Sequence, residues 1–460
     1  MNASERRATV ALGSIFALRM LGLFMIVPVF AIYGQAYSGA TPALLGLAIG
    51  VYGLTQAFLQ IPVSLLADRV PRKPLIVIGL LLFALGGAVA AMSESIWGVI
   101  LGRAIAGGGA VSAVVMALLA DVTREEQRSK AMAAMGMSIA LSFIVAFSLG
   151  PVLTHWVGLS GLFWLTSIAA ILAIGLLAVV PTPMRLLKQT PKAYREQLRS
   201  VLSLPDLNRL HLSIFMLHLL MTAAFVMIPS QLIKYANIPV DHHGWVYLPL
   251  LLLGFVLAIP AIIIAEAKRR MRRIFVSAVA LIGTSMLVLA IFDQTKWGLL
   301  IGIGLFFIAF NMLEALLPSW MSKRAPIAAR ATAMGINASS QFFGAFVGGV
   351  LGGQLLTYVG PQWSWGLLAG LSIIWFMVVL RLASPPYLSS LAVRLPDASI
   401  DQQDHLNAHD WAIRLLDVRG VEDVVVLPDQ NVAYLKIDKQ QLDADARHDL
   451  SQLLGHPVVF

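Results

Sequence analysis

One carboxylate in this sequence lies well inside a long apolar run. Glu314 falls within the run 297–321, whereas the other acidic residues of the apolar part of the chain lie near the ends of such runs. A charge at that depth in a bilayer costs at least about 2.5 kcal/mol, so the carboxyl should be neutral when dry and charged only when hydrated or paired. Glu314 is therefore the first candidate for a proton site. The alternative is a structural hydrogen bond to Asn311 or to another helix.

Two arginines and one histidine lie in other apolar runs. An arginine keeps its proton at physiological pH, so Arg103 or Arg19 could tune the proton affinity of a carboxyl or hold an anion. Arg19 could instead extend to the membrane surface or pair with a helix end. His218 can titrate near neutrality, although a lone histidine on a helix is more often a structural, hydrogen-bonded residue.

A dense run of charges, Asp68-Arg69-Val-Pro-Arg72-Lys73, separates two long apolar runs. Charges placed there must lie at a membrane surface. Asp68 could pair with the neighbouring arginines and hold one conformation closed until the pairs break, or the charges could simply set the topology. The expected gating charge cluster comprises Asp68, Arg69, Arg72, Lys73, Asp121 and Arg128.

The composition requires lipid as the main solvent of the chain. Of 460 residues, 58% are hydrophobic and only 12% are charged, and the mean hydropathy is +0.81, so there is too little polar surface to cover a soluble globule. Backbone groups in lipid must be satisfied internally, and continuous apolar runs predict helices rather than a barrel. Because cysteine is absent, disulfides, thiolate metal sites and cysteine nucleophiles are excluded.

Twelve apolar segments are long enough to cross a bilayer. Because the number is even, both termini should lie on one side, and the loops of the opposite side keep only Lys234 and Lys296, which predicts cytoplasmic termini. The first segment follows polar residues without a cleavage site, so an uncleaved helix is expected. The segments are 9–33, 43–67, 74–92, 97–120, 131–155, 160–181, 210–234, 244–266, 274–292, 297–321, 331–358 and 363–382.

The membrane part is a duplication, because short matching pairs recur about 200 residues apart. Two of them are Ile61-Pro62 with Ile259-Pro260, and Trp97-Gly98 with Trp297-Gly298. Such repeats predict two six-helix halves related by a pseudo-twofold axis along the membrane normal. The expected domains are an N-terminal six-helix bundle (1–181), a cytoplasmic basic linker (182–209), a C-terminal six-helix bundle (210–386) and a soluble domain (387–460).

After Pro385-Pro386 the composition becomes that of a soluble protein. Strand-like and helical stretches follow in the order β-α-β-β-α-β, which predicts a small α/β ferredoxin-like domain. It lacks the Met-x-Cys-x-x-Cys loop of metal-carrying ferredoxin-like domains, and a solvated face explains His405 and His409 better than a metal site does. A regulatory or docking module is expected, for which a cytoplasmic regulator would be the partner.

Three motifs resemble those of the major facilitator superfamily. Asp68-Arg69-x-x-Arg72-Lys73 resembles its Gly-x-Leu-Ala-Asp-Arg-x-Gly-Arg-Lys hallmark, with Ser64 and Pro71 in place of glycines. Arg103-x-x-Ala106-Gly107-x-Gly109 resembles its Arg-x-x-Gln-Gly-x-Gly element, and Ala146-x-x-x-Gly150-Pro151 resembles the Gly-x-x-x-Gly-Pro element of antiporters. With the ferredoxin-like tail, the chain looks like the YajR-type drug/proton antiporters of this superfamily.

The resemblance implies an all-α membrane protein of twelve transmembrane helices that alternates between inward-open and outward-open states. It also implies that Arg103 takes part in proton coupling, which gives an expected set of Glu314, Arg103 and His218. Residues that permit bending and close helix packing, as ordinary structural glycines also do, are Gly107, Gly109, Gly150 and Pro151.

Two polar stripes could face a central cavity, because Gln56 and Gln60 lie one turn apart on one helix and Asn337 and Gln341 on another. An apolar cavity with one acid would suit hydrophobic or cationic drug-like compounds. The expected function is therefore proton-coupled efflux by an antiporter of the cytoplasmic (inner) membrane. The possible cavity residues are Tyr52, Gln56, Gln60, Asn311, Asn337 and Gln341.

Two alternatives remain open: a proton symporter or facilitator for a small metabolite, and a transporter-like sensor that signals through its tail. The chain has no Gly-x-x-x-x-Gly-Lys-Ser/Thr loop, which disfavours drive by ATP, and no enzyme activity is expected. His242-His243 lacks a third ligand, so neither a metal nor a cofactor is expected beyond the proton as coupling ion. The expected partners are the lipid bilayer, a small-molecule substrate and protons, without nucleic acid.

Overall fold

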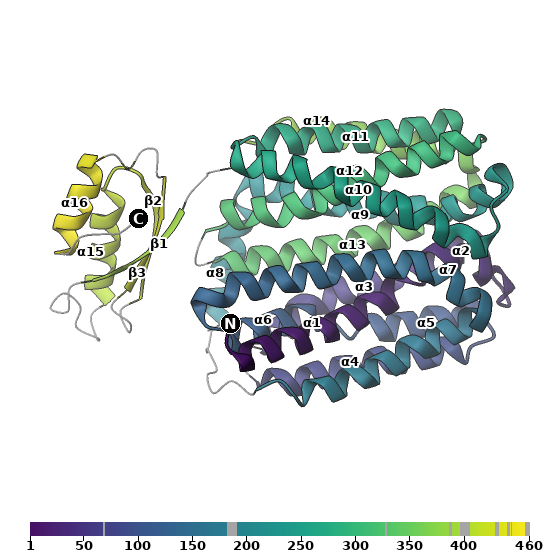
Figure 1. The fold of residues 1–460 in the computed structure, drawn as a ribbon, viewed down its shortest axis with the longest axis horizontal. Helices are drawn as coiled ribbons and strands as arrows, with labels where there is room; N and C mark the ends of the chain where they lie inside the picture. The colour runs from purple at the N-terminus through teal and green to yellow at the C-terminus, as the bar shows by residue number, and fades with distance from the viewer. Residues whose placement is uncertain are drawn as a thin grey trace. The chain divides into compact units, whose positions relative to one another are not determined.

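The protein is mostly helical and has one small sheet near its C-terminus (Figure 1). Its structure is a computed structural model that describes residues 1–67, 70–181, 191–326, 329–385, 389–395, 405–427, 432–438, 442 and 444–455. Two compact units are distinguished. The first comprises Met1–Ala193, Arg209–Leu317 and Gly335–Leu382, and the second comprises Tyr194–Asn208, Pro318–Met334 and Ala383–Phe460.

The N-terminal half of the membrane part crosses the bundle six times within its described residues. Its first pass is continued from α1 into α2, because Met25 and Ile26 keep helical backbone angles. The long α7 contains two passes, since Gly158 inside it has φ 71°, a backbone conformation that favours glycine. The helices are α1 (Ala3–Phe24), α2 (Val27–Tyr33), α3 (Pro42–Ala67), α4 (Arg72–Ala91), α5 (Ile96–Gly107), α6 (Ser112–Val122) and α7 (Glu125–Leu177).

The C-terminal half supplies six more long helices, after the short amphipathic α8 (Pro191–Leu202). In Figure 1 the helices of the N-terminal half fill the lower part of the bundle and those of the C-terminal half fill the upper part. They are α9 (Pro205–Ala236), α10 (His243–Ala267), α11 (Met271–Phe292), α12 (Lys296–Arg324), α13 (Arg330–Tyr358) and α14 (Pro361–Val379).

Ten described stretches are long and apolar enough to cross a membrane. They include α7 once, although it holds two passes, and they leave out α13, which carries Asn337, Ser339, Ser340 and Gln341. Counting α7 as two passes and adding α13 gives the twelve predicted segments. The predicted fold class, a helical membrane protein with a small α/β domain, is confirmed.

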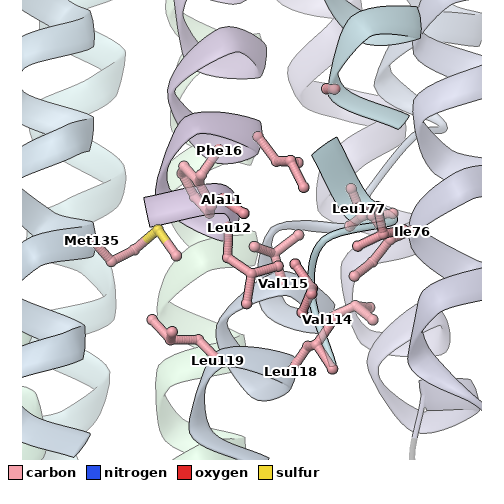
Figure 2. Close-up of a cluster of buried hydrophobic side chains, with 14 of the residues drawn as sticks. Ala11, Leu12, Phe16, Ile76, Val114, Val115, Leu118, Leu119, Met135 and Leu177 are labelled. Atoms are coloured by element: carbon pink, nitrogen blue, oxygen red, sulfur yellow. The ribbon is translucent and has the colours of Figure 1, made fainter. Parts of the chain in front are cut away.

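Apolar side chains hold the N-terminal half together at the end of the bundle that carries Arg72 and Lys73, which we call the basic end. Figure 2 shows side chains of α1, α4, α6 and α7 converging there. Among the members that are fully buried or nearly so are Leu12, Leu118 and Met135. Close van der Waals packing of these side chains holds the helices together, which favours movement of this half as one body.

The two halves meet where α3 crosses α13. A side-chain carbon added to Gly46 would lie 2.2 Å from the carbonyl oxygen of Gly349, and one added to Gly53 would lie 2.4 Å from that of Phe342. Glycine therefore permits backbone contact between the halves, as small residues commonly do between membrane helices. Because α3 ends near Arg72, these contacts lie in the part of the bundle remote from the basic end.

The tail forms a three-stranded antiparallel sheet in the order β1-β3-β2. Figure 1 shows both tail helices on one face of it, as the predicted ferredoxin-like order requires. Buried Leu415, Leu435 and Leu450 fill the core between them. The predicted last strand, 458–460, lies outside the described residues. The elements are β1 (Ser389–Arg394), α15 (His405–Leu416), β2 (Val421–Leu427), β3 (Val432–Ile437) and α16 (Ala444–Leu454).

Within the second compact unit, the sheet contacts the last turn of a membrane helix. The buried Nζ of Lys436 on β3 donates to the carbonyl oxygen of Ala325 at 2.6 Å, directly after α12 ends. A few residues away, Arg324 pairs with Asp206 at the start of α9, at 2.7 Å. A lysine can satisfy the free carbonyls at a helix C-terminus and interact favourably with the helix dipole. The tail is thus fastened to α12.

Candidate functional site

A polar centre lies between α9, α12 and α13 of the C-terminal half. Gln341 Nε2 lies 2.8 Å from His218 Nε2 and donates to Glu314 Oε1 at 3.5 Å, and Glu314 Oε2 lies 3.8 Å from His218 Nε2. Two predicted proton-coupling residues and one predicted cavity residue therefore meet. The hydrogen-bond partner of Glu314 therefore lies on another helix, α13. It is not Asn311, whose amide donates to the Phe307 carbonyl oxygen of its own helix at 2.9 Å.

The hydrogen bonds of His218 determine which ring nitrogen carries the proton in the neutral form. Its Nδ1 lies 3.1 Å from the carbonyl oxygen of Ile214, which can only accept, so Nδ1 is the donor. Nε2 is then free to accept from the Gln341 amide. A proton arriving from Glu314 would reach this same nitrogen, which makes His218 a possible second station for the proton.

Glu314 lies on a face of α12 that packs against the other half. Its side chain is 39% exposed, whereas that of His218 is 5% exposed. One turn earlier on the same face of α12, Phe310 stacks on Phe143 of α7 with ring centroids 5.6 Å apart. That contact crosses between the halves, so this face of α12 is directed toward the N-terminal half, while Glu314 Oε2 is itself buried and has no hydrogen-bond partner among the described residues.

A second polar centre lies in the N-terminal half and surrounds Arg19, which is 3% exposed. Its Nη1 donates to Ser112 Oγ at 2.5 Å, and its Nη2 donates to Tyr52 OH at 2.8 Å and to Gln56 Oε1 at 2.6 Å. All three partners are neutral. Sequence reasoning left Arg19 as a residue that could reach the membrane surface, but the structure buries it among these side chains.

Arg103 is held separately, by the backbone of α3. Its guanidinium donates to the carbonyl oxygens of Ala48 and Ile49 and lies 5.8 Å from the centroid of the Tyr52 ring. A cavity of about 20 Å³, enough for about one water, lies beside Arg103 and Tyr52. Among the described contacts, none joins Arg103 to Glu314. A direct influence of Arg103 on that carboxyl, as predicted, therefore has no support in this conformation.

The gating charge cluster is only partly visible. Arg72 pairs with Asp121 at 3.1 Å, and Lys73 donates to the carbonyl oxygen of Val180. Asp68 and Arg69 lie outside the described residues, and the same holds for the side chain of Arg128. The pair Arg72 and Asp121 connects α4 with α6 inside one half.

The ion pair between Glu5 and Arg124 was not predicted from the sequence. The Glu5 carboxylate near the start of α1 pairs with Arg124 at 2.8 Å. It also accepts from the backbone N–H of Asn2, the N-cap residue of its own helix. The pattern Asn2-x-x-Glu5 is a recognisable capping box, but its long-range partner was not visible from sequence.

The predicted bending residues lie at close helix contacts. A carbon added to Gly107 would lie 2.3 Å from the carbonyl oxygen of Tyr52, and one added to Gly150 would lie 2.6 Å from that of Met25. Gly109 falls in the break between α5 and α6 and approaches the carbonyl oxygen of Gly79 at 2.3 Å by the same measure. Pro151 lies inside α7 without ending it.

The predicted cavity residues divide between the two centres. Tyr52 and Gln56 bind Arg19, and Gln341 belongs to the Glu314 centre. Gln60 is buried one turn beyond Gln56, and its Oε1 has no hydrogen-bond partner among the described residues. The buried Oδ1 of Asn337 is likewise without a hydrogen-bond partner in that part of the chain.

A third buried polar group lies at the end of the bundle remote from the basic end. Trp365 Nε1 donates to Gln231 Oε1 at 3.1 Å, and Gln231 Nε2 donates to Asp293 Oδ2 at 3.2 Å. Burial raises the pKa of the Asp293 carboxyl, although its own backbone amide and Lys234 act in the opposite direction. Sequence reasoning missed this group because Asp293 reads as an ordinary loop residue.

Comparisons with known proteins agree with this architecture. The inner membrane transport protein YajR of Escherichia coli (strain K12) is 45% identical over 442 residues, which cover 96% of each chain. The multidrug resistance protein MdtH of Aeromonas salmonicida (strain A449) is 27% identical over 75% of this chain and 86% of that protein. The crystal structure of the nucleoside transporter NupG has the same fold, with a TM-score of 0.67 at 13% identity, and covers 82% of this chain and 99% of that one.

The sequence matches the family description Major Facilitator Superfamily over residues 12–326 and 266–411. These ranges include both halves, both polar centres and the start of the tail. Together with the high identity to YajR, they show that the chain belongs to the Major Facilitator Superfamily of membrane transporters.

Proposed function

We propose that this transporter is a proton-coupled antiporter that exports hydrophobic, drug-like compounds across the inner membrane. The observation that carries the proposal is the Glu314 centre, where a carboxyl within a membrane helix has one long hydrogen bond and one buried oxygen without a hydrogen-bond partner among the described residues. A carboxyl in such surroundings can change its protonation as the halves move. One charge crossing the membrane is worth about 2.3 kcal/mol per 100 mV, which is the energy that coupling would use.

His218 and Gln341 have distinct parts in this proposal. Protonated Glu314 can turn its O–H toward His218 Nε2, 3.8 Å away, whereas ionised Glu314 can accept more strongly from the Gln341 amide. The two protonation states therefore favour different arrangements of α9, α12 and α13. A proton that changes helix contacts is the requirement for coupling it to a conformational change.

The contacts between the halves support alternating access. Backbone contact at Gly46 and Gly53 brings the halves together away from the basic end. If the basic end lies in the cytoplasm, as the distribution of Lys and Arg favours, this conformation is closed on the periplasmic side. Transport would require these contacts to separate while others form at the basic end.

The choice of substrate class is supported by similarity to a protein named for multidrug resistance, at 27% identity. The carboxyl of Glu314 would suit a cationic group on such a compound. Arg19 and Arg103, however, place buried positive charge in the opposite half. Glu314 alone therefore does not decide the charge of the substrate.

Proton movement in vesicles tests the proposal. Wild type and Glu314→Gln would be reconstituted, and substrate-driven proton flux across an imposed pH gradient followed with a trapped pH-sensitive dye, using a panel of drug-like compounds. We expect Glu314→Gln to reduce this flux at least about tenfold, because a glutamine cannot carry the proton. Glu94→Gln, the same change at an exposed loop carboxylate, serves as the matched control. Equal flux in wild type and Glu314→Gln would refute the assigned proton site.

A further inference from the structure

We propose that the Arg19 centre binds an acidic group of the substrate, and that the transported compounds are organic carboxylates with an apolar body. The proposal rests on the transport function proposed above and specifies its substrate class. It follows from four features of the described residues: the uncompensated charge of Arg19, the unpaired Nε of its guanidinium, the surplus of hydrogen-bond donors around it, and its place beside the contact between the halves.

The charge of Arg19 is not balanced by a carboxylate. Its side chain donates to a serine hydroxyl, a tyrosine hydroxyl and a glutamine amide oxygen, and no ion pair of Arg19 occurs among the described residues. Arg103, on the other side of the Tyr52 ring, is likewise bonded only to backbone carbonyls. Burying a charge without an opposite charge is costly, so two such arginines in one half favour binding of an anion.

One N–H of the Arg19 guanidinium, that of Nε, has no partner among the described residues. The buried Nε lacks any hydrogen bond in the described part of the chain, whereas both terminal nitrogens already donate. Nη2, which shares this side of the guanidinium, already donates to Tyr52 OH and Gln56 Oε1, so an anion would accept a single charge-assisted N–H···O bond from Nε. The unused N–H thus points to a missing acceptor.

The neighbours of Arg19 also have more donors than acceptors. Ser112 Oγ accepts from Arg19 and from Gln56 Nε2, the latter at 3.3 Å, and Tyr52 OH accepts from Arg19. Neither hydroxyl donates to an acceptor among the described residues. Together with Arg19 Nε, two hydroxyl protons therefore remain available. A carboxylate accepts several hydrogen bonds and would satisfy all three.

The Arg19 centre lies next to the contact between the halves. Gly53 touches the backbone of Phe342 in α13, and Gln56 follows it by one turn toward the basic end. The Phe342 side chain also packs in one cluster with Tyr52. A group bound at Arg19 would therefore lie beside the surfaces that separate and rejoin during alternating access, as a substrate site requires. An apolar body could extend along the neighbouring aromatic side chains.

Binding of three matched compounds to the purified full-length protein tests this inference. They are 1-naphthoate, its neutral amide 1-naphthamide, and the cation 1-naphthylmethylammonium, which share one apolar body. Titration calorimetry should show that wild type binds the carboxylate at least about tenfold more tightly than the amide. Arg19→Gln should abolish this preference and leave amide binding unchanged, whereas Arg7→Gln, at an exposed arginine of the same helix, should keep it.

Equal binding of the carboxylate and the amide by wild type, or no binding of the carboxylate up to millimolar concentration, would overturn the inference. A preference for the cation would overturn it as well and would favour Glu314 as the charge that selects the substrate. If Arg19→Gln does not fold, Tyr52→Phe and Ser112→Ala should each weaken carboxylate binding about threefold, because each removes one hydroxyl donor. Unchanged binding in both would contradict the proposed site.

The outcome is separable from that of the proposed function. These measurements use no pH gradient, so they report the site even if Glu314 proves unrelated to proton coupling. Conversely, loss of proton flux in Glu314→Gln together with indifferent binding of the three compounds would support the antiporter and reject the carboxylate site.

Discussion

The polar centres of the two halves differ in enclosure and in the kind of charge they hold. Arg19 is 3% exposed and donates three hydrogen bonds to three neutral side chains, whereas the Glu314 side chain is 39% exposed and has one long hydrogen bond. Arginine keeps its charge at every physiological pH, and a carboxyl or a histidine does not. One half thus holds a constant charge in a rigid setting, and the other holds a charge that can change.

Under the two proposals above, this difference would divide the work between the halves. Each half supplies six passes of the membrane part, but the buried polar residues of the two halves differ. A group that must titrate has to be reachable by water and loosely held, and a group that anchors an anion has to be oriented beforehand. The two requirements conflict in a single site, so placing them in separate halves meets both.

The largest effect on transport is expected for Glu314→Gln, measured in two kinds of assay. We expect flux driven by a pH gradient to fall at least about tenfold, while exchange of labelled for unlabelled substrate without a gradient stays within about twofold of wild type. The reason is that substrate exchange needs alternating access but no change of protonation. Loss of both activities would assign Glu314 to substrate binding rather than to coupling.

The second largest effect is expected for Arg19→Gln and concerns the binding preference among substrates. Arg19→Gln should change which compounds bind rather than whether protons move, so it tests the division of work from the opposite half. An altered response to the pH gradient for a neutral compound would contradict that division.

A smaller effect, on stability, distinguishes the rigid centre from the loose one. Gln56→Leu removes an acceptor from the buried Arg19 and should lower the free energy of unfolding by about 1.5–3 kcal/mol. Gln341→Leu removes one neutral hydrogen bond to His218 and one long hydrogen bond to Glu314, so it should cost less, about 1 kcal/mol. Thermal unfolding in detergent compares them, and similar losses in both variants would contradict the contrast in rigidity.

The smallest expected effect concerns Asp293, which lies between α11 and α12. Its pKa is raised by burial, so the folded state favours the neutral form more than the unfolded state does. The native protein should therefore lose stability as pH rises from the ordinary aspartate pKa through the raised value. Asp293→Asn should remove this loss, so that its melting temperature exceeds that of wild type by about 1–2 °C at neutral pH and by less in acid. A difference that does not change with pH would exclude ionisation as the cause.

Sequence reasoning succeeded where a local pattern carries the physics. Continuous apolar runs must form helices in lipid, so the twelve segments and the halves could be predicted without contacts. The order β-α-β-β-α along the described tail was equally readable, because each strand and helix shows in its local pattern of apolar and polar residues. Glu314 was found because a carboxylate inside an apolar run is a conspicuous exception.

Only the tertiary structure decided which side chains meet. His218 and Gln341 are 123 residues apart in sequence, and their shared contact with Glu314 depends on how three helices rotate about their axes. Helical periodicity gives the polar face of one helix but not the helix that this face touches. The same reason explains why Arg19 could not be joined in advance to Ser112, and why Arg103, similar in sequence context, binds backbone carbonyls instead. Lipid exposure selects apolar residues along the chain, whereas pairing inside the bundle depends on packing between distant segments.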